Sequence, residues 1–178
     1  MALFRVHVVA NSNYVTMAPG FFSTLENLFS RCQQGSDFDD FTTTWWTHRP
    51  MGRAGHEPIV WMLPNKAASL IKKVYPGVAL DPSSGGTTYW KDKGTISEVY
   101  MDYQALISPA AQAKMAFHEL MHNKLQKGKE LHSTSYGNGL NLGSINFSDN
   151  GTALDWDNKE MMGAALSKVV PQYEPPFN

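Results

Sequence analysis

Residues 108–128 read SPAAQAKMAFHELMHNKLQKG. Ser108 followed by Pro109 is a typical helix start, because serine can cap the free amides and proline is tolerated in the first turn. The apolar residues that follow predict a helix buried in the core, which runs through about Gln126 and ends near Gly128. We therefore expect the fold to be organised around this helix.

Two histidines of this helix, His118 and His122, are four residues apart. Because one helical turn contains 3.6 residues, both imidazoles project from the same face and can bind one metal ion. Glu119 follows the first histidine, where its carboxylate can take a proton from a water molecule that the metal has made acidic. This spacing indicates a catalytic zinc site, and the plain alternative is a helix with two incidental histidines.

A third protein ligand is expected, because a catalytic zinc usually has three protein ligands and one water molecule. Four downstream residues can fill this place: His132, Asp155, Asp157 and Glu160. His132 is the first choice, since a histidine in a polar, glycine-flanked loop has no evident structural role. Asp157 and Glu160 do have such a role, because residues 157–160 read as a helix capping box.

The whole chain predicts an α+β fold, in which a small twisted sheet is packed on one side by helices. Strands are expected at 4–8, 59–63 and 95–103, and further helices at 19–32, 65–75 and 158–169. Residues 33–56 read as a long surface loop and residues 81–88 as a turn region. We expect a single domain over 1–178, with a sheet-and-helix part (1–107) and a part that holds the metal helix, the metal loop and the last helix (108–178).

Composition narrows the classes of partner. The 15 basic and 16 acidic residues give a net charge of -1, so neither nucleic acid nor a membrane is expected as a partner. No stretch approaches the ~20 apolar residues that span a bilayer, and residues 1–10 do not read as a secretory signal. The protein is therefore expected to be cytoplasmic or to be exported without a signal peptide. Cys32 is the only cysteine and is expected to be a buried, inert thiol.

The motif His118-Glu119-Leu120-Met121-His122 resembles the His-Glu-x-x-His helix of the zincin metallopeptidases. The resemblance is strong over this helix, weak over the C-terminal third, and does not extend to the residues before the helix. In zincins the helix packs under a small twisted sheet, and an edge strand of that sheet binds the substrate in extended form. The resemblance implies that the strand at 95–103 is this edge strand.

Metzincins, a zincin subgroup, carry His-Glu-x-x-His-x-x-Gly-x-x-His. The corresponding positions here hold Leu125 and Gly128, so the strict pattern is absent. A lengthened version is present, in which Gly128 ends the helix and His132 returns to the metal. The same resemblance would make Met161 or Met162 a methionine turn beneath the metal.

Other zincin groups keep the alternatives for the third ligand open. Gluzincins take a glutamate from a later helix, which would be Glu160. Aspzincins carry Gly-Thr-x-Asp, and Asp155 ends a version of this motif that is one residue too long. Several zincins also stabilise the oxyanion of the reaction with a tyrosine or histidine near the metal, and Tyr136 is the candidate here.

The expected function is that of a metalloendopeptidase, which binds one Zn2+ and hydrolyses polypeptides with a zinc-bound water activated by Glu119. A small peptidase without a visible propeptide needs control, which suggests a secreted or injected effector or toxin with a cognate inhibitor or immunity protein. Peptidoglycan peptides are a second substrate class for the same chemistry. The competing class is a non-catalytic, zinc-stabilised binding module, although structural zinc sites are usually rich in cysteine.

Overall fold

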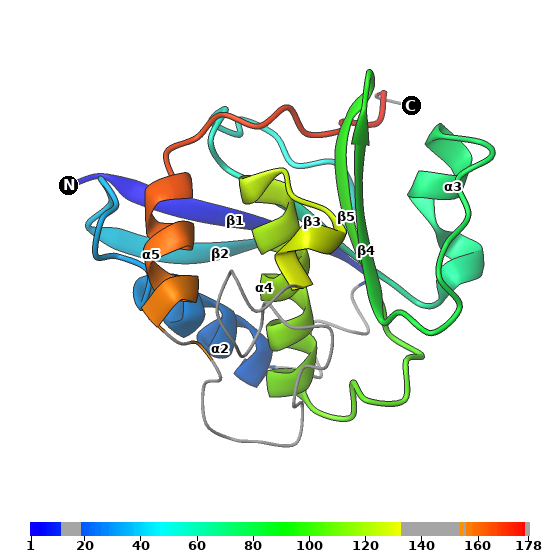
Figure 1. The fold of residues 1–178 in the computed structure, drawn as a ribbon, viewed down its shortest axis with the longest axis horizontal. Helices are drawn as coiled ribbons and strands as arrows, with labels where there is room; N and C mark the ends of the chain where they lie inside the picture. The colour runs from blue at the N-terminus through cyan, green and yellow to red at the C-terminus, as the bar shows by residue number, and fades with distance from the viewer. Residues whose placement is uncertain (12–18, 133–153, 155, 177–178) are drawn as a thin grey trace.

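The computed structural model describes residues 1–11, 19–132, 154 and 156–176. These residues form a five-stranded sheet in the order β2-β1-β3-β5-β4 (Figure 1). The strands are β1 (Leu3–Ala10), β2 (Asp40–Trp46), β3 (Ile59–Leu63), β4 (Gly86–Lys91) and β5 (Gly94–Tyr100). Four strands are parallel to their neighbours, and β4 alone pairs antiparallel, with β5. The mixed sheet and its helices confirm the expected α+β fold.

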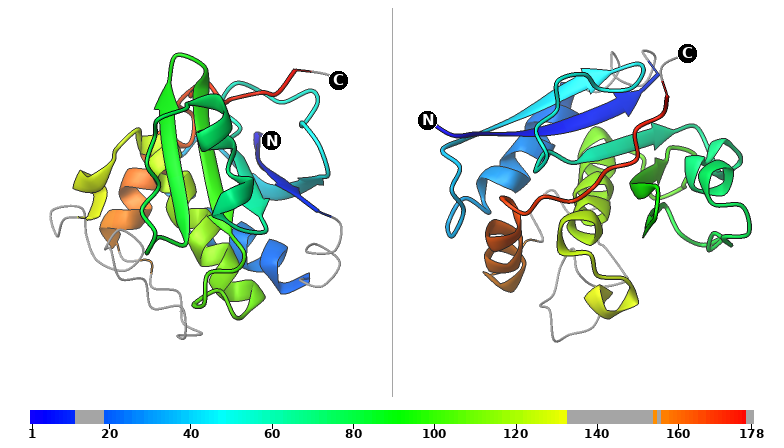
Figure 2. Two further views of the ribbon diagram at one scale, coloured as in Figure 1. Left: turned by 90° about the vertical axis from the view of Figure 1, so that its right-hand side faces the viewer. Right: turned by 90° about the horizontal axis from the view of Figure 1, so that it is seen from above.

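Helices cover both faces of the sheet, but unequally. The helices are α2 (Pro19–Ser30), α3 (Leu70–Val74), α4 (Pro109–Leu125) and α5 (Trp156–Ala165), with short 3-10 helices η1 (Lys66–Ala68) and η2 (Lys129–His132). The main core joins α2, α4 and α5 to one face, and Figure 2 shows these helices on the same side of β1 and β2. A smaller core joins α3 to the opposite face. The expectation that helices pack on one side only was therefore incomplete.

Helix α4 is the central element of the main core. Ser108 caps it, as predicted, since its side chain accepts a hydrogen bond from the Ala111 amide at 3.1 Å, and Pro109 occupies the first turn. Phe117, Leu120 and Met121 are completely buried between the sheet and the other helices. The helix ends at Leu125, and Gln126 adopts a left-handed conformation with φ 52°. The chain can therefore turn back toward the helix at this point.

Two strands were missed by the sequence interpretation. β2 lies inside the predicted surface loop at 33–56, and β4 starts inside the predicted turn region at 81–88. Both are edge strands, and most of their residues are only partly buried. Their sequences, DFTTTWW and GTTYWK, are rich in threonine and aromatic residues, which favour strands without a strict apolar alternation.

The expectation that the strand at 95–103 forms the sheet edge is wrong. β5 lies between β3 and β4, and all seven of its residues are buried. β4 reverses into β5 through a tight turn, in which Gly94 has φ 102°. This hairpin adds one more strand outside β5, so the edge strand is β4.

The C-terminal part corrects two smaller expectations. α5 begins at Trp156, so Asp157 lies in its first turn and does not cap the helix. Met161 and Met162 both lie within α5, so the expected methionine turn is wrong. Beyond α5, Gln172 forms a parallel bridge with Thr95 at the start of β5. The end of the chain is thus joined to the sheet beside α4.

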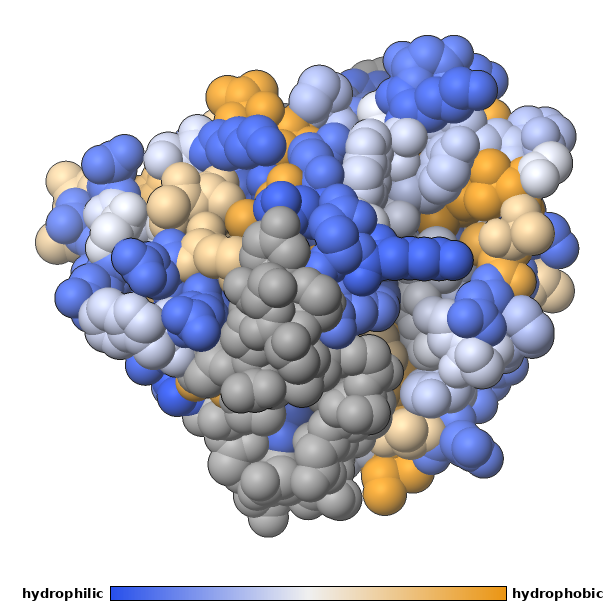
Figure 3. Space-filling model, in the orientation of Figure 1, coloured by the Kyte–Doolittle hydropathy of each residue, from blue (hydrophilic) through white to orange (hydrophobic). Residues whose placement is uncertain are grey.

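Among the helices described, none combines the length and apolar character needed to cross a bilayer. On the face in Figure 3, the described hydrophobic residues form small separate groups between hydrophilic ones. Cys32 is buried and free, as expected, and burial raises the pKa of its thiol to about 12.

Candidate metal centre

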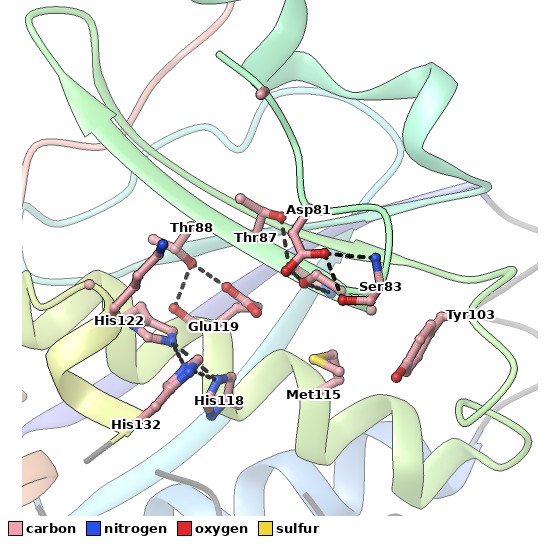
Figure 4. Close-up of a pocket in the computed structure, with 16 residues that line it drawn as sticks. Asp81, Ser83, Thr87, Thr88, Tyr103, Met115, His118, Glu119, His122 and His132 are labelled. Atoms are coloured by element: carbon pink, nitrogen blue, oxygen red, sulfur yellow. Dashed lines mark hydrogen bonds between the residues drawn. The ribbon is translucent and has the colours of Figure 1, made fainter. Parts of the chain in front are cut away.

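Three imidazoles converge on one point beside α4 (Figure 4). His118 and His122 come from adjacent turns of α4, and His132 comes from η2. The Nε2 atom of His122 lies 3.1 Å from that of His118 and 3.0 Å from that of His132. The Nε2 atoms of His118 and His132 are 3.2 Å apart. Helix geometry explains why His118 and His122 lie together, and the turn after α4 brings His132 to them.

This donor set fits a metal ion. A tetrahedral zinc with bonds of about 2.0–2.1 Å to nitrogen holds its ligand nitrogens roughly 3.3 Å apart. The three separations in this cluster are close to that value. Neutral imidazoles suit zinc, copper, nickel and iron, so the cluster can hold a metal ion without specifying which one.

The imidazole of His122 is fixed by the end of its own helix. Its Nδ1 atom lies 2.7 Å from the carbonyl oxygen of Lys127, to which it donates. This bond leaves Nε2 as the atom with the free lone pair, and Nε2 is the atom that faces the other two histidines. The left-handed conformation of Gln126 makes this contact feasible, because it folds Lys127 back over the last turn.

Burial favours the neutral form of His122 and His132, which is the form that binds a metal. It lowers the pKa of His122 to about 4, against the opposing effect of the hydrogen bond to Lys127. Desolvation also lowers the pKa of His132, although this residue is exposed overall. Neutral imidazoles at neutral pH have lone pairs available, so no proton must leave these two residues before a metal binds.

Glu119 is buried next to the cluster. Only 4% of the residue is exposed, and burial raises the pKa of its carboxyl to about 8, with a smaller contribution from Glu98. The Thr88 hydroxyl, which works against this shift, lies 2.8 Å from Oε2. A carboxyl with a pKa near the working pH can both accept and release a proton.

A pocket of about 440 Å³ opens over these residues, between β4 and α4. Glu119 and all three histidines contribute to its lining. In Figure 4, Met115 and Tyr103 lie on the side away from the histidines, and Asp81 and Ser83 lie above them. The remaining lining residues are Ala79, Ser84, Gly85, Gly86, Thr87, Thr88, Gly128 and Lys129.

The structure describes two of the three alternatives to His132 as the third metal ligand, Asp157 and Glu160, and neither belongs to the histidine cluster. Among the described His, Cys, Asp and Glu side chains, only the three histidines form a group that could hold a metal. Glu160 lines a separate small pocket with Arg31 and Trp156. Asp157 is exposed in the first turn of α5. Asp155 and Tyr136 lie outside the described residues, so their predicted roles stay predictions.

Two residues of the site were not found from the sequence. Thr88 contacts the carboxylate of Glu119, and a side chain at Gly86 would collide with it, since a Cβ there would lie 2.6 Å from Oε1. Both residues were assigned to a turn region. The strand-favouring run Thr87-Thr88-Tyr89-Trp90 is the signal that could have identified this strand.

Comparisons with known proteins leave the family open. No family model matches the chain, and neither a curated protein nor a solved structure matches it. The function must therefore be inferred from the site itself.

Proposed function

We propose that the protein is a zinc-dependent metallopeptidase of the zincin type, with His118, His122 and His132 as ligands and Glu119 as the general base. The supporting observation is the convergence of three imidazole nitrogens beside a buried carboxylate in one open pocket. A structural zinc site would not need this carboxylate, and such sites are usually closed. The pocket leaves room for a substrate next to the cluster.

The residues of the site divide the chemistry between them. A zinc ion supplies a Lewis acid and lowers the pKa of a water ligand to about 7. Glu119 would accept the proton of the attacking water at its carboxylate and later donate it to the leaving amine. His122, whose Nδ1 is occupied by the Lys127 carbonyl, would keep a fixed orientation throughout.

The candidate surface for an extended polypeptide is the edge of β4. In the described part of the chain no strand pairs with the outer side of β4, and this strand borders the pocket. An unpaired strand edge can bind a peptide by adding a strand to the sheet. The resemblance to zincins favours the same arrangement, with β4 in place of the strand at 95–103.

Metal content measured by mass spectrometry tests the ligand set. We expect about one zinc per chain in the wild type, because three neutral imidazoles and a water complete a four-coordinate site. His132→Ala should lose the zinc, whereas the control Glu160→Ala should keep it. Zinc that is retained by His132→Ala and lost by Glu160→Ala would contradict the proposed ligands.

Glu119→Gln then separates catalysis from simple metal binding. This variant should retain zinc and lose hydrolysis of unfolded casein or of a mixed peptide library. Equal and measurable hydrolysis in both proteins would exclude Glu119 as the base. Zinc binding without hydrolysis in the wild type would favour a non-catalytic zinc module.

A further inference from the structure

We infer that Thr88 is a positioning residue, whose hydroxyl holds the Glu119 carboxylate in one orientation toward the metal centre. The inference deepens the proposed function, since it assigns an orienting partner to the proposed base. Thr88 lies in β4, and Glu119 lies in α4, so the contact joins the edge strand to the metal helix. Figure 4 shows the two side chains facing each other beside the histidine cluster.

Three oxygen atoms surround the Thr88 hydroxyl. Its Oγ1 atom lies 2.8 Å from Glu119 Oε2, 2.9 Å from the Glu119 carbonyl oxygen and 3.0 Å from Ser97 Oγ. A hydroxyl has only one hydrogen to donate. When Glu119 acts as a base its carboxylate is ionised, and the charge-assisted hydrogen bond to it is then the strongest of the three choices.

The neighbouring side chains support the same direction of donation. The amide of Asn123 donates from Nδ2 to Ser97 Oγ at 3.0 Å. Since Ser97 already accepts from Asn123, its own hydrogen is free to point at Thr88 Oγ1. Thr88 then accepts from Ser97 and donates to Glu119.

Gln172 fixes the far end of this chain of hydrogen bonds. Its Nε2 atom donates to Asn123 Oδ1 at 2.8 Å, and its Oε1 atom accepts from Asn123 Nδ2 at 2.8 Å. Both hydrogens of the Asn123 amide therefore have acceptors, so the amide has one favourable orientation. Ser97 and Asn123 are completely buried and Gln172 is 8% exposed, which leaves little access for competing water.

The hydroxyl of Thr88 is not needed for the strand itself. Thr88 is paired with Ser97 through the backbone of the β4–β5 hairpin, and this pairing does not depend on the side chain. Valine has nearly the same shape as threonine and favours strands at least as strongly. Thr88→Val should therefore remove the donor and preserve the fold.

Crystal structures of four zinc-loaded proteins test the inference directly. These are the wild type, Thr88→Val, Thr88→Ser and the control Thr43→Val on β2, whose hydroxyl is buried without a hydrogen-bond partner among the described residues. We expect the Glu119 carboxylate to rotate or to occupy several positions in Thr88→Val. It should keep its wild-type position in Thr88→Ser, which restores the donor, and in Thr43→Val.

Kinetics on the same proteins should follow the structures. Thr88→Val should lower kcat about 10- to 100-fold and change KM little, since misplacement of a catalytic group costs about this much. Thr88→Ser should recover most of the loss, and zinc content should be unchanged in all variants. A single, unmoved carboxylate in Thr88→Val would overturn the inference, whether or not the protein hydrolyses peptides. A displaced carboxylate in a protein without peptidase activity would support the positioning role of Thr88 and contradict the proposed function.

Discussion

Glu119 is confined by two residues on the same face of β4. Thr88 donates to one carboxylate oxygen, and Gly86, two residues earlier, leaves space for the other. Alternate residues of a strand point to the same face, so both positions turn toward α4. The edge strand therefore shapes the environment of the proposed base as well as the wall of the pocket.

Gly86→Ala tests the space beside the carboxylate. A Cβ at this position would lie 2.6 Å from Glu119 Oε1 and 2.7 Å from its Cγ, so the side chain of Glu119 must move. We expect peptidase activity to fall by about 100-fold, which is typical of a misplacement of about 1 Å, with zinc content unchanged. The measurements are kcat/KM and metal content.

Gly20→Ala is the matched control, because among the described residues a Cβ there would meet only Pro109 Cβ, at an ordinary 3.6 Å. This variant should keep full activity. Full activity in Gly86→Ala as well would mean that the carboxylate can shift without consequence.

Residues of the site differed in how well they could be predicted. His118 and His122 follow from helix geometry, since a spacing of four places two side chains on one face. His132 ranked first because it had no structural role, and the structure brings it to the other two. Thr88 and Gly86 could not be placed in the same way, because their contact with Glu119 depends on the register of the β4–β5 hairpin. Sequence spacing does not encode such long-range pairings.

Helix α4 depends on its N-terminal cap. Ser108→Ala removes the acceptor for the Ala111 amide, which should lower the free energy of unfolding by about 1 kcal/mol. For a chain of this size the melting temperature should fall by roughly 2–4 °C. Thermal and urea unfolding followed by circular dichroism measure both quantities.

Ser23→Ala serves as the control for this substitution. Ser23 is exposed in α2, and its hydroxyl donates only to the Gly20 carbonyl, at 3.3 Å. Its replacement should leave stability unchanged or raise it slightly, because alanine is the better helix former. Equal stability of Ser108→Ala and the wild type would show that water caps the helix equally well.

Some helices and strands could be predicted from the sequence, and others were missed for a physical reason. α4 combines a cap, a proline and a buried apolar sequence, and three independent signals agreed. β1 and β3 lie inside the sheet and carry the apolar residues that identified them. β2 and β4 form its two edges, where one side of each strand has no neighbour and fewer residues must be apolar. Their pattern was therefore too weak to separate them from loops.

The segment after α5 joins elements that are distant in the sequence. Gln172 Oε1 accepts from the Ile59 amide at the start of β3 at 3.1 Å, and the Gln172 side chain exchanges two hydrogen bonds with Asn123 of α4. The backbone on either side of it pairs with Thr95 of β5. The Gln172 side chain thus connects β3 to the metal helix, and the backbone on either side of it adds the connection to β5.

Gln172→Ala should consequently destabilise the entire fold. It removes the acceptor of the Ile59 amide and both bonds between Gln172 and the Asn123 side chain in a buried region, and each unsatisfied polar group costs about 1–3 kcal/mol. We expect a loss of about 2–4 kcal/mol in the free energy of unfolding and a fall of roughly 5–15 °C in melting temperature. Gln33→Ala is the control, because Gln33 is exposed and, among the described residues, its side chain bonds only to the Asp39 carbonyl, at 3.3 Å. A loss below about 1 kcal/mol in Gln172→Ala would mean that water replaces these bonds and that β3 and α4 hold together without the Gln172 side chain.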